Sequence, residues 1–317
     1  MQYWNLDDET ETRDVPPARD AERSAYSFND YSREDLRSYP NCLQEENHSL
    51  IYTRSLAPIG VFDSGVGGFT ILSALRQELP HENYIYFGDT AHLPYGTRTE
   101  EDITELALQC CRFLLEQGVK LIVVGCNTAS QAALNTLRAT FSIPFVGVVP
   151  AVKPAARITR NGRIGVAATN RAAQAAYLRQ LIEEFATGIE TYAIGCPELV
   201  TLVERGELDG PEVEETLRQA LNPLLAKNVD VIVLGCTHFP ALRPAIQRVV
   251  GKRVQVIDSA AAIARRTHAV LDTDGLLHPA GSQGGDLQVW CSGDALAFGE
   301  VASKILSYPV TARQWHP

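Results

Sequence analysis

The sequence predicts an α/β protein with two pseudosymmetric domains, each a mostly parallel sheet flanked by helices, with the active site in the cleft between them. Three observations support this fold class. The 317 residues suffice for about two domains. From Ile59 onward, apolar β-branched runs alternate with helical patterns. The order of these runs then repeats once. We expect residues 56–149 plus 259–317 to form the first domain and residues 150–258 the second.

The first half of the body alternates strands and helices. We expect strands at residues 59–62, 84–87, 121–124 and 145–149, because each is a short apolar run rich in β-branched or aromatic residues. Helical spacing of apolar residues predicts helices at 70–79, at 101–117 and from Asn127. Gly118 follows the second helix, as glycine often does at a helix end.

The second half repeats these strings. Residues 163–166 repeat the Ile-Gly-Val of residues 58–61, and residues 231–236 repeat the apolar run that ends in Gly-Cys at residue 126. The interval from Gly60 to Cys126 is 66 residues, and that from Gly165 to Cys236 is 71. Residues 253–257 supply a counterpart of the fourth strand. The matching order favours two related halves over chance similarity of short α/β strings.

The C-terminal tail continues the pattern. A helix at residues 260–271 precedes a glycine-rich stretch at 281–285, a strand at 287–291 and a helix from Ala295. We expect the tail to return to the first domain, since its strand needs a sheet to join.

The N-terminal segment has a different composition. Residues 1–55 hold 12 acidic residues and 6 arginines, so they carry −6 of the formal net charge of −10. They contain Pro16-Pro17 and show no convincing period, apart from a short helix that residues 33–38 could form. We expect an acidic extension that is partly disordered or packed on the body, and that is regulatory or inert.

Composition excludes several classes of protein. The hydrophobic fraction of 45% and the charged fraction of 21% are typical of a globular chain. Duplex-nucleic-acid binding needs a basic face, which a net charge of −10 disfavours. No run of 18 apolar residues predicts a membrane span, and the acidic start is unlike a signal peptide. The seven cysteines are odd in number and lack a C-x-x-C pair, so we expect reduced thiols in the cytoplasm.

A glycine-rich turn follows the first strand. Asp63-Ser64-Gly65-Val66-Gly67-Gly68 stands where a strand turns into a helix, and exposed backbone N–H groups at such a place form an anion site. Neither the dinucleotide fingerprint nor the Walker lysine is present. The alternative is a tight turn without a ligand, but Asp63 stands at the strand's carboxyl end, where open α/β sheets bind ligands.

Two cysteines occupy equivalent places in the two halves. Cys126 follows the third strand and precedes Asn127-Thr128 at a helix start, where a thiolate is favoured. Cys236 repeats that position, with Thr237-His238 directly after it. Each alone could be a buried structural cysteine. Together they could lie on opposite sides of one small ligand in the cleft.

Two opposed acid/base groups are suited to inverting a carbon stereocentre. One removes a proton from one face, and the other returns a proton to the opposite face. Each thiol then needs a partner for its proton: Asp63 could assist Cys126, and His238 could assist Cys236. Glu198 is a further candidate, and its alternative is a solvated carboxylate at a helix start.

Cofactor and metal chemistry have weaker support in the sequence. Pyridoxal phosphate needs a Schiff-base lysine, and of the five lysines only Lys153 lies in a suggestive turn, with no phosphate cup nearby. A metal site would have to combine Cys236 and His238 with residues distant in sequence. We therefore expect a site with neither cofactor nor metal.

These strings resemble the glutamate racemase family. The resemblance covers roughly residues 58–309, with six motifs in family order: Phe62-Asp-Ser-Gly-Val-Gly-Gly, Gly88-Asp-Thr-Ala-His-Leu-Pro-Tyr-Gly, Gly125-Cys-Asn-Thr-Ala-Ser, Val148-Val-Pro-Ala, Glu198-Leu-Val and Gly235-Cys-Thr-His-Phe-Pro. The family interconverts L- and D-glutamate without a cofactor and supplies D-glutamate for peptidoglycan. The resemblance implies that activity here.

The resemblance also implies residue roles. Cys126 corresponds to the base for D-glutamate and Cys236 to the base for L-glutamate, assisted by Asp63 and His238, with Asp89 and Glu198 as supporting residues. The implied substrate-binding residues are Asp63, Ser64, Tyr95, Gly96, Asn127, Thr128, Thr237 and His238. The two domains are implied to close on the substrate.

The extension departs from most of the family. A subgroup with a shorter extension is activated by the precursor UDP-N-acetylmuramoyl-L-alanine, and it is similar to this chain around residues 146–157 and 258–267. Activation by that precursor is therefore a hypothesis. Some members inhibit DNA gyrase, which makes gyrase a conceivable partner. Alternative functions are racemisation of a related amino acid such as aspartate, and a binding protein on a racemase scaffold.

Overall fold

A computed structural model describes residues 52–279 and 281–316. They belong to one compact unit, His48–Pro317. The helix expected at residues 33–38, and the expectations for the acidic extension up to residue 51, lie outside the described residues. No helix of the described part is both long and apolar enough to cross a membrane.

The first sheet has the strand order β10-β9-β2-β1-β3-β4, and all neighbouring strands are parallel. Its strands are β1 (Ile59–Asp63), β2 (Tyr84–Gly88), β3 (Leu121–Val124), β4 (Phe145–Gly147), β9 (Leu287–Cys291) and β10 (Ala312–Gln314). Strand β9 pairs with β2, so the C-terminal tail enters this sheet.

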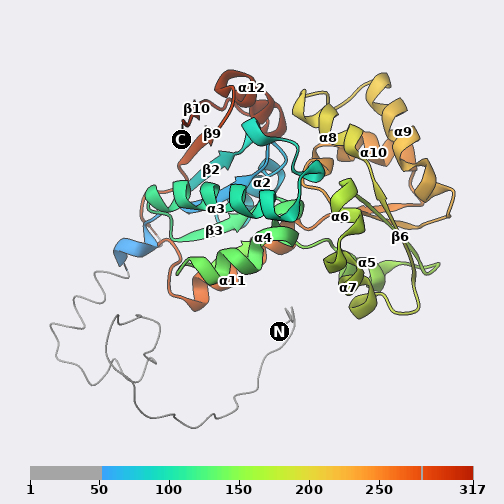
Figure 1. Cartoon of the computed structure of the whole chain (residues 1–317), viewed down its shortest axis with the longest axis horizontal. Coiled ribbons are helices and arrows are strands. Elements are labelled where there is room, and N and C mark those ends of the chain that lie inside the picture. Colours follow the sequence, from blue (N-terminus) through green and yellow to red (C-terminus); the bar gives the residue numbers. More distant parts are fainter. Residues whose placement is uncertain (1–51, 280, 317) are drawn as a thin grey trace, which may run out of the picture. The chain divides into compact units, whose positions relative to one another are not determined.

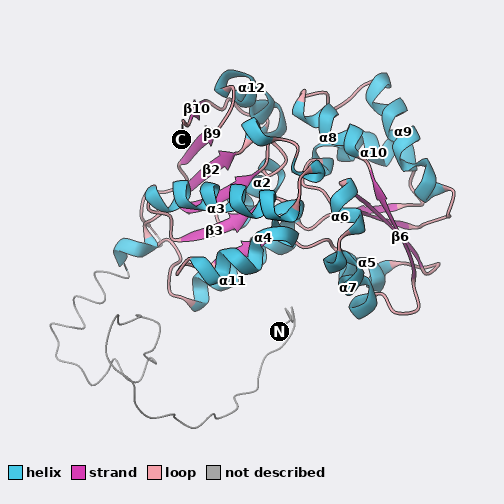
Figure 2. Ribbon diagram, viewed as in Figure 1, coloured by secondary structure: helices cyan, strands magenta, loops and turns pink. Residues whose placement is uncertain are grey.

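Helices cover both faces of the first sheet (Figures 1 and 2). They are α2 (Phe69–Glu78), α11 (Ala260–Thr273) and α12 (Ala295–Leu306) on one face, and α3 (Glu100–Glu116) and α4 (Asn127–Thr140) on the other. Successive residues of a strand point to opposite faces. Val61 thus packs in the core with α2, and Phe62 packs in the core with α3. We call this sheet with its helices the first lobe.

The second sheet has the order β6-β5-β7-β8 and is also parallel. Its strands are β5 (Arg163–Ala168), β6 (Glu190–Gly195), β7 (Val231–Leu234) and β8 (Gln255–Ile257). The order matches β2-β1-β3-β4 of the first sheet, element for element. The repeat expected from the sequence is therefore confirmed: β5 corresponds to β1, and β7 to β3.

The helices of the second sheet also divide between its faces. They are α5 (Val152–Ile158), α6 (Asn170–Gln174), α7 (Ala176–Phe185), α8 (Pro197–Glu204), α9 (Pro211–Leu225) and α10 (Arg243–Val250). Val231 and Val233 pack with α5 and α7, whereas Ile232 and Leu234 pack with α8, α9 and α10. We call this sheet with its helices the second lobe.

Some strand limits differ from expectation. The strand expected at 145–149 ends at Gly147, where the chain prepares to leave the first lobe. The strand expected at 253–257 begins at Gln255, because residues 252–253 form a turn. Strands β6 and β10 were not foreseen. Both lie at sheet edges and are largely exposed or half-buried, so neither shows a clear apolar pattern.

The chain crosses between the lobes twice, near Val149 and near Asp258. The Ser259 hydroxyl donates a hydrogen bond to the Val149 carbonyl, so the two crossings lie side by side. We propose these crossings as the domain boundaries, with residues 56–149 plus 259–317 in one domain and 150–258 in the other. Two adjacent crossings are suited to act as a hinge.

Candidate active site

The chemically interesting side chains gather where the central strands end. Asp63 ends β1, Cys126 follows β3, and Cys236 follows β7. In parallel sheets the carboxyl ends of neighbouring strands meet at one edge, which is where ligands bind. Gly125 and Gly235 donate backbone hydrogen bonds of 2.7 Å to Phe62 and Ala167. These matching bonds place the two cysteines equivalently in their lobes.

Cys126 lies beside a serine and an aspartate. Its Sγ is 3.8 Å from Ser64 Oγ, which donates to Asp63 Oδ1 at 3.1 Å. The thiol is 5% exposed. Burial raises the pKa of Cys126, and the negative charges of Asp63 and Cys236 add to the rise. The thiol is therefore protonated at neutral pH, and Ser64 connects it to the carboxylate.

Cys236 has a histidine and a glutamate instead. Its Sγ is 3.6 Å from His238 Nδ1, and His238 Nε2 is 2.5 Å from Glu204 Oε1. Burial opposes a charged imidazole, but the hydrogen bonds and negative charges of Cys236 and Glu204 outweigh it. The pKa of His238 consequently rises well above its ordinary value. At neutral pH an imidazolium therefore stands 3.6 Å from this sulfur.

Asp63 links the surroundings of Cys126 to those of Cys236, because its carboxylate accepts hydrogen bonds from both lobes. Thr237 Oγ1, from the second lobe, donates to Asp63 Oδ2 at 2.8 Å, and Gly65 N donates to Oδ1 at 2.9 Å. Burial raises the pKa of Asp63, although the charge of His238 and these hydrogen bonds oppose the rise. A carboxyl group with a raised pKa can exchange a proton nearer to neutral pH.

The glycine-rich turn binds a carboxylate of the protein itself. Val66 N, at this turn, donates to Glu204 Oε1 at 2.9 Å. A Cβ on Gly65 would lie 2.0 Å from Glu204 Oε1, and one on Gly67 would lie 2.4 Å from His238 Nδ1. The Glu204 carboxylate thus occupies the anion site expected at this turn. Gly65 and Gly67 lack the Cβ atoms that would collide with Glu204 and His238 of the second lobe.

Glu204 is the polar residue that the sequence reasoning missed. Glu198, the predicted candidate, lies on the exposed side of α8, six residues earlier, and its proposed role stays a prediction. Glu204 stands four residues after Val200, which is buried, so both occupy one helix face. This spacing could have indicated that Glu204 points toward the protein interior. One of its partners, Val66, lies in the other lobe, so the spacing does not identify it.

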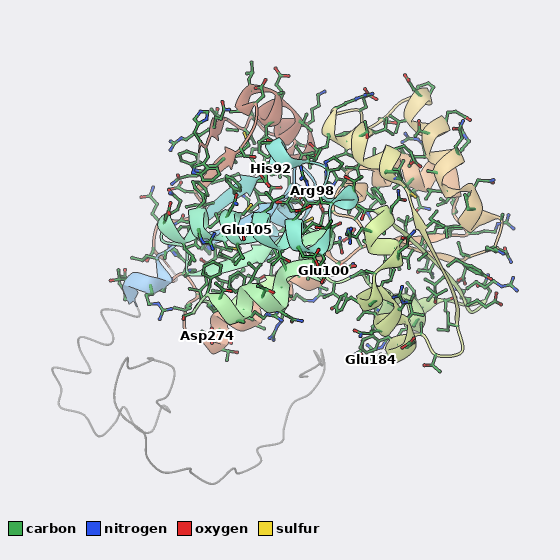
Figure 3. The ribbon with its side chains drawn as sticks, in the orientation of Figure 1. His92, Arg98, Glu100, Glu105, Glu184 and Asp274 are labelled. Atoms are coloured by element: carbon green, nitrogen blue, oxygen red, sulfur yellow. The ribbon has the colours of Figure 1, made fainter. Side chains whose placement is uncertain are left out.

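Asp89 fixes the loop that carries Tyr95 and Gly96. Its carboxylate accepts hydrogen bonds from Tyr95 Oη at 2.6 Å and Ser292 Oγ at 2.8 Å, and it pairs with His92 Nδ1 at 2.8 Å. Arg98 Nε donates to the His92 carbonyl at 2.7 Å, and Figure 3 shows both residues on this loop. Asp89 thereby holds the loop in position through His92 and Tyr95.

Asn127 and Thr128 begin α4 beside Cys126. The side-chain oxygen of Asn127 is buried without a hydrogen-bond partner, so it can accept from a bound ligand. Thr128 Oγ1 is 3.1 Å from Thr169 Oγ1 of the second lobe. The structure therefore brings Asp63, Ser64, Asn127, Thr128, Thr237 and His238 to the two cysteines, while Tyr95 and Gly96 lie on the adjoining loop.

Lys153 lies on α5 with its ammonium over the Phe185 ring, 5.3 Å from the ring centroid. This cation–π contact gives the lysine a structural role. No group of three or more histidine, cysteine or acidic residues within residues 52–279 and 281–316 is arranged to hold a metal ion.

Comparisons with known proteins agree with this geometry. The family model of the Asp/Glu/hydantoin racemases matches residues 70–267. A glutamate racemase of Roseiflexus is 41% identical over 253 residues, covering 80% of this chain and 93% of its own length.

Solved structures are similar over the same region. A glutamate racemase isoform of Bacillus anthracis superposes with a TM-score of 0.73 at 33% identity, covering 82% of this chain and 97% of its own. The Escherichia coli glutamate racemase, solved with L-glutamate and the activator UDP-MurNAc-Ala, gives 0.72 at 35% identity, with 81% and 97% covered. Together with the paired thiols at equivalent strand ends, these matches show that the chain belongs to the Asp/Glu/hydantoin racemase family.

Proposed function

We propose that the chain is a cofactor-independent glutamate racemase that interconverts L- and D-glutamate with two thiols. The observation that carries this proposal is the different surroundings of the two cysteines. Cys126 is held as a thiol near Asp63, and Cys236 faces the His238 imidazolium. A racemase needs one thiolate and one thiol at the start of each turnover, and this pair supplies them.

In the direction from L- to D-glutamate, the Cys236 thiolate removes the proton on Cα. The resulting carbanion takes a proton from the Cys126 thiol on the opposite face, so the stereocentre is inverted and no proton is gained or lost overall. The imidazolium of His238, which lies 3.6 Å from Cys236, stabilises the thiolate before the transfer.

In the direction from D- to L-glutamate, Cys126 must first become the thiolate. Ser64 links its sulfur to Asp63, whose raised pKa allows it to take the proton through the serine hydroxyl. Cys236 takes a proton from the His238 imidazolium and donates it to the opposite face of the carbanion, while Cys126 keeps the proton from Cα. Asp63 then holds one proton more and His238 one proton fewer than at the start, and exchange with solvent when the lobes part restores both.

Substrate binding falls to polar groups around the cysteines. We assign the substrate ammonium to the free acceptor of Asn127. The carboxylates are assigned to hydroxyls and N–H groups of Ser64, Thr128, Thr237 and the Tyr95-Gly96 loop. Because Asp63, Cys126 and Cys236 are at most 5% exposed, the lobes must part to admit glutamate and close again for reaction.

The product and the compartment follow from this chemistry. D-glutamate would serve peptidoglycan synthesis. Both thiols must stay reduced, and the described cysteines are all free, so we place the reaction in the reducing cytoplasm. No feature of residues 52–279 and 281–316 identifies a surface for DNA gyrase, and gyrase is left out of the proposal.

The test is circular dichroism of L-glutamate solutions with purified protein. We expect the signal to decay to zero with the wild type, and racemisation to fall by about 1,000-fold or more in Cys126→Ser and in Cys236→Ser, as loss of a general base predicts. L-Aspartate serves as the competing substrate and should react far more slowly. Activity that persists in both variants would remove the two-thiol mechanism.

We also propose activation by UDP-N-acetylmuramoyl-L-alanine. The Escherichia coli relative is solved with the activator UDP-MurNAc-Ala. In this chain Arg138 of α4 lies close enough to Arg266 of α11 for that positive charge to add to burial in lowering its pKa, while Tyr177 of the second lobe opposes the shift. Neighbouring guanidinium groups are suited to a diphosphate.

Steady-state kinetics with and without the precursor test activation. We expect kcat/KM to rise many-fold when the precursor is added, and Arg138→Gln to reduce that rise while leaving the basal rate unchanged. Equal rates with and without precursor would refute activation, but they would leave racemisation itself intact.

A further inference from the structure

The reactive groups are closed off from solvent, so glutamate needs a route to them. Cys126 and Cys236 are each 5% exposed, and Asp63 is fully buried. The substrate-binding residues Asn127 and Thr128 are 4% exposed. Glutamate therefore enters where the seam between the lobes separates with the least loss of bonding.

The two sides of this seam are bonded unequally. Toward α2 and α12, Glu204 accepts from Val66 N, Thr70 Oγ1 donates to the Thr237 carbonyl at 2.9 Å, and Lys304 Nζ donates to the Gly206 carbonyl at 3.3 Å. Toward α4, Thr128 and Thr169 share a side-chain hydrogen bond across the described lobes, and the charge of Arg138 acts on Tyr177 of the second lobe. The α4 side is the more easily opened one.

A polar pocket of about 450 Å³ lies on that weaker side. Its size is within the range of small-molecule sites. The first lobe contributes Gly96, Glu100, Thr128 and Gln131, and the second lobe contributes Arg171 among others. Gly96 and Thr128 also belong to the proposed substrate site, so the pocket adjoins it. Figure 3 shows Glu100 on the part of the first lobe that is next to the second.

The pocket presents unused hydrogen-bonding groups. Both polar atoms of the Gln131 amide are buried without a partner, and so is Arg171 Nε. No hydrogen bond or ion pair within residues 52–279 and 281–316 involves the Arg171 side chain, and it is the pocket's cationic residue. Glu100 supplies a negative charge. A guanidinium, an amide and a carboxylate together complement an amino acid with an additional carboxylate.

We propose that this pocket is an encounter site for glutamate. Arg171 attracts and holds a substrate carboxylate, Glu100 faces the ammonium, and the substrate passes between Thr128 and Thr169 when the lobes part. This inference rests on the proposed racemase function and adds to it a capture residue outside the catalytic centre.

The test compares Arg171→Gln with Arg160→Gln. Arg160 is exposed and precedes β5, whereas Arg171 follows the end of that six-residue strand. The control variant therefore removes the same charge at the opposite end of β5, away from the pocket. For Arg171→Gln we expect KM for both enantiomers to rise roughly 3- to 10-fold with kcat little changed, and kcat/KM to lose salt dependence, as loss of electrostatic steering predicts. Arg160→Gln should change neither quantity.

A blocking variant gives an independent readout. Ala176 is exposed and lines the pocket, so Ala176→Trp fills it without entering the core. We expect kcat/KM to fall roughly 5-fold or more, since steering and access are both reduced. Ala226→Trp, at an exposed residue directly after α9, is the control. Wild-type KM and salt dependence in Arg171→Gln, or wild-type kcat/KM in Ala176→Trp, would overturn the encounter site alone. A wild-type protein that racemises no glutamate would overturn the proposed function.

Discussion

At the scale of single residues, the two cysteines owe their different states to their neighbours. Each follows a Gly at the end of a central strand, so backbone geometry alone would make them alike. Burial and the charge of Asp63 keep the Cys126 thiol protonated, whereas the His238 imidazolium lies beside Cys236. Glu204 contributes to that difference, because it bonds His238 directly and adds to the rise in its pKa.

Glu204→Gln should shift the pH profile. Removing the carboxylate charge lowers the raised pKa of His238 toward its ordinary value, so the imidazolium is lost at a lower pH. The alkaline limb of kcat/KM should therefore move to lower pH, with a fall of about 10- to 100-fold at its optimum. Glu198→Gln, on the same helix but exposed, is the matched control and should behave as wild type. The opposite pattern would restore Glu198 as the supporting carboxylate.

At the scale of elements, the turn between β1 and α2 is the surface on which the second lobe closes. Its N–H group binds Glu204, and its glycines leave room for His238 and Thr237. Tyr86 of β2 donates to the Gly65 carbonyl at 2.8 Å and holds the turn in place. The turn therefore determines how closely the two thiols approach one substrate.

Gly67→Ala should impair closure more than folding. The added Cβ would lie 2.4 Å from His238 Nδ1 and 2.7 Å from Thr237 Oγ1, both buried side chains. We expect kcat/KM to fall about 100-fold, the effect of a small misplacement of reacting groups. Gly96→Ala meets Thr169 at 3.0 Å on the other side of the seam and should lose less. Kinetics with thermal melts check this, and equal losses in both variants would contradict it.

The elements also show what could be predicted from sequence. Strands at 121–124 and 287–291 were placed at their observed limits, because apolar runs bounded by turn residues define them. The edge strand β6 was missed, since its half-exposed residues lack that pattern. The cysteines and Asp63 were found from their positions at strand ends. Glu204 was not, because its partners, Val66 and His238, are brought to it only by tertiary packing.

At the scale of the whole molecule, the described body begins before β1. Residues 52–55 are helical, and Ser55 is buried. Its carbonyl accepts from Lys120 Nζ at 2.5 Å, and the same ammonium pairs with Glu82 at 2.5 Å. A buried ammonium needs both partners. The boundary expected after residue 55 therefore cuts through a contact of the body.

Two truncations separate these boundaries. Deleting residues 1–47 keeps the compact unit His48–Pro317, and we expect its Tm and its basal activity to match the full chain. Deleting residues 1–55 also removes the Ser55 acceptor of Lys120, which should cost about 1–3 kcal/mol and lower Tm by several degrees. Differential scanning calorimetry measures both. Identical Tm values for the two truncations would show that the Ser55 contact contributes nothing.

The two lobes have matching strand orders, and the two directions of the reaction between them are constrained by the substrates themselves. L- and D-glutamate are mirror images with equal free energy in water, so their equilibrium constant is unity. The ratio of kcat/KM in the two directions must equal that constant, in the wild type and in every variant. The unlike partners of Cys126 and Cys236 therefore cannot favour one enantiomer at equilibrium. They can only change how kcat/KM in each direction is made up of kcat and KM. Glu204→Gln must therefore lower kcat/KM for both enantiomers by the same factor.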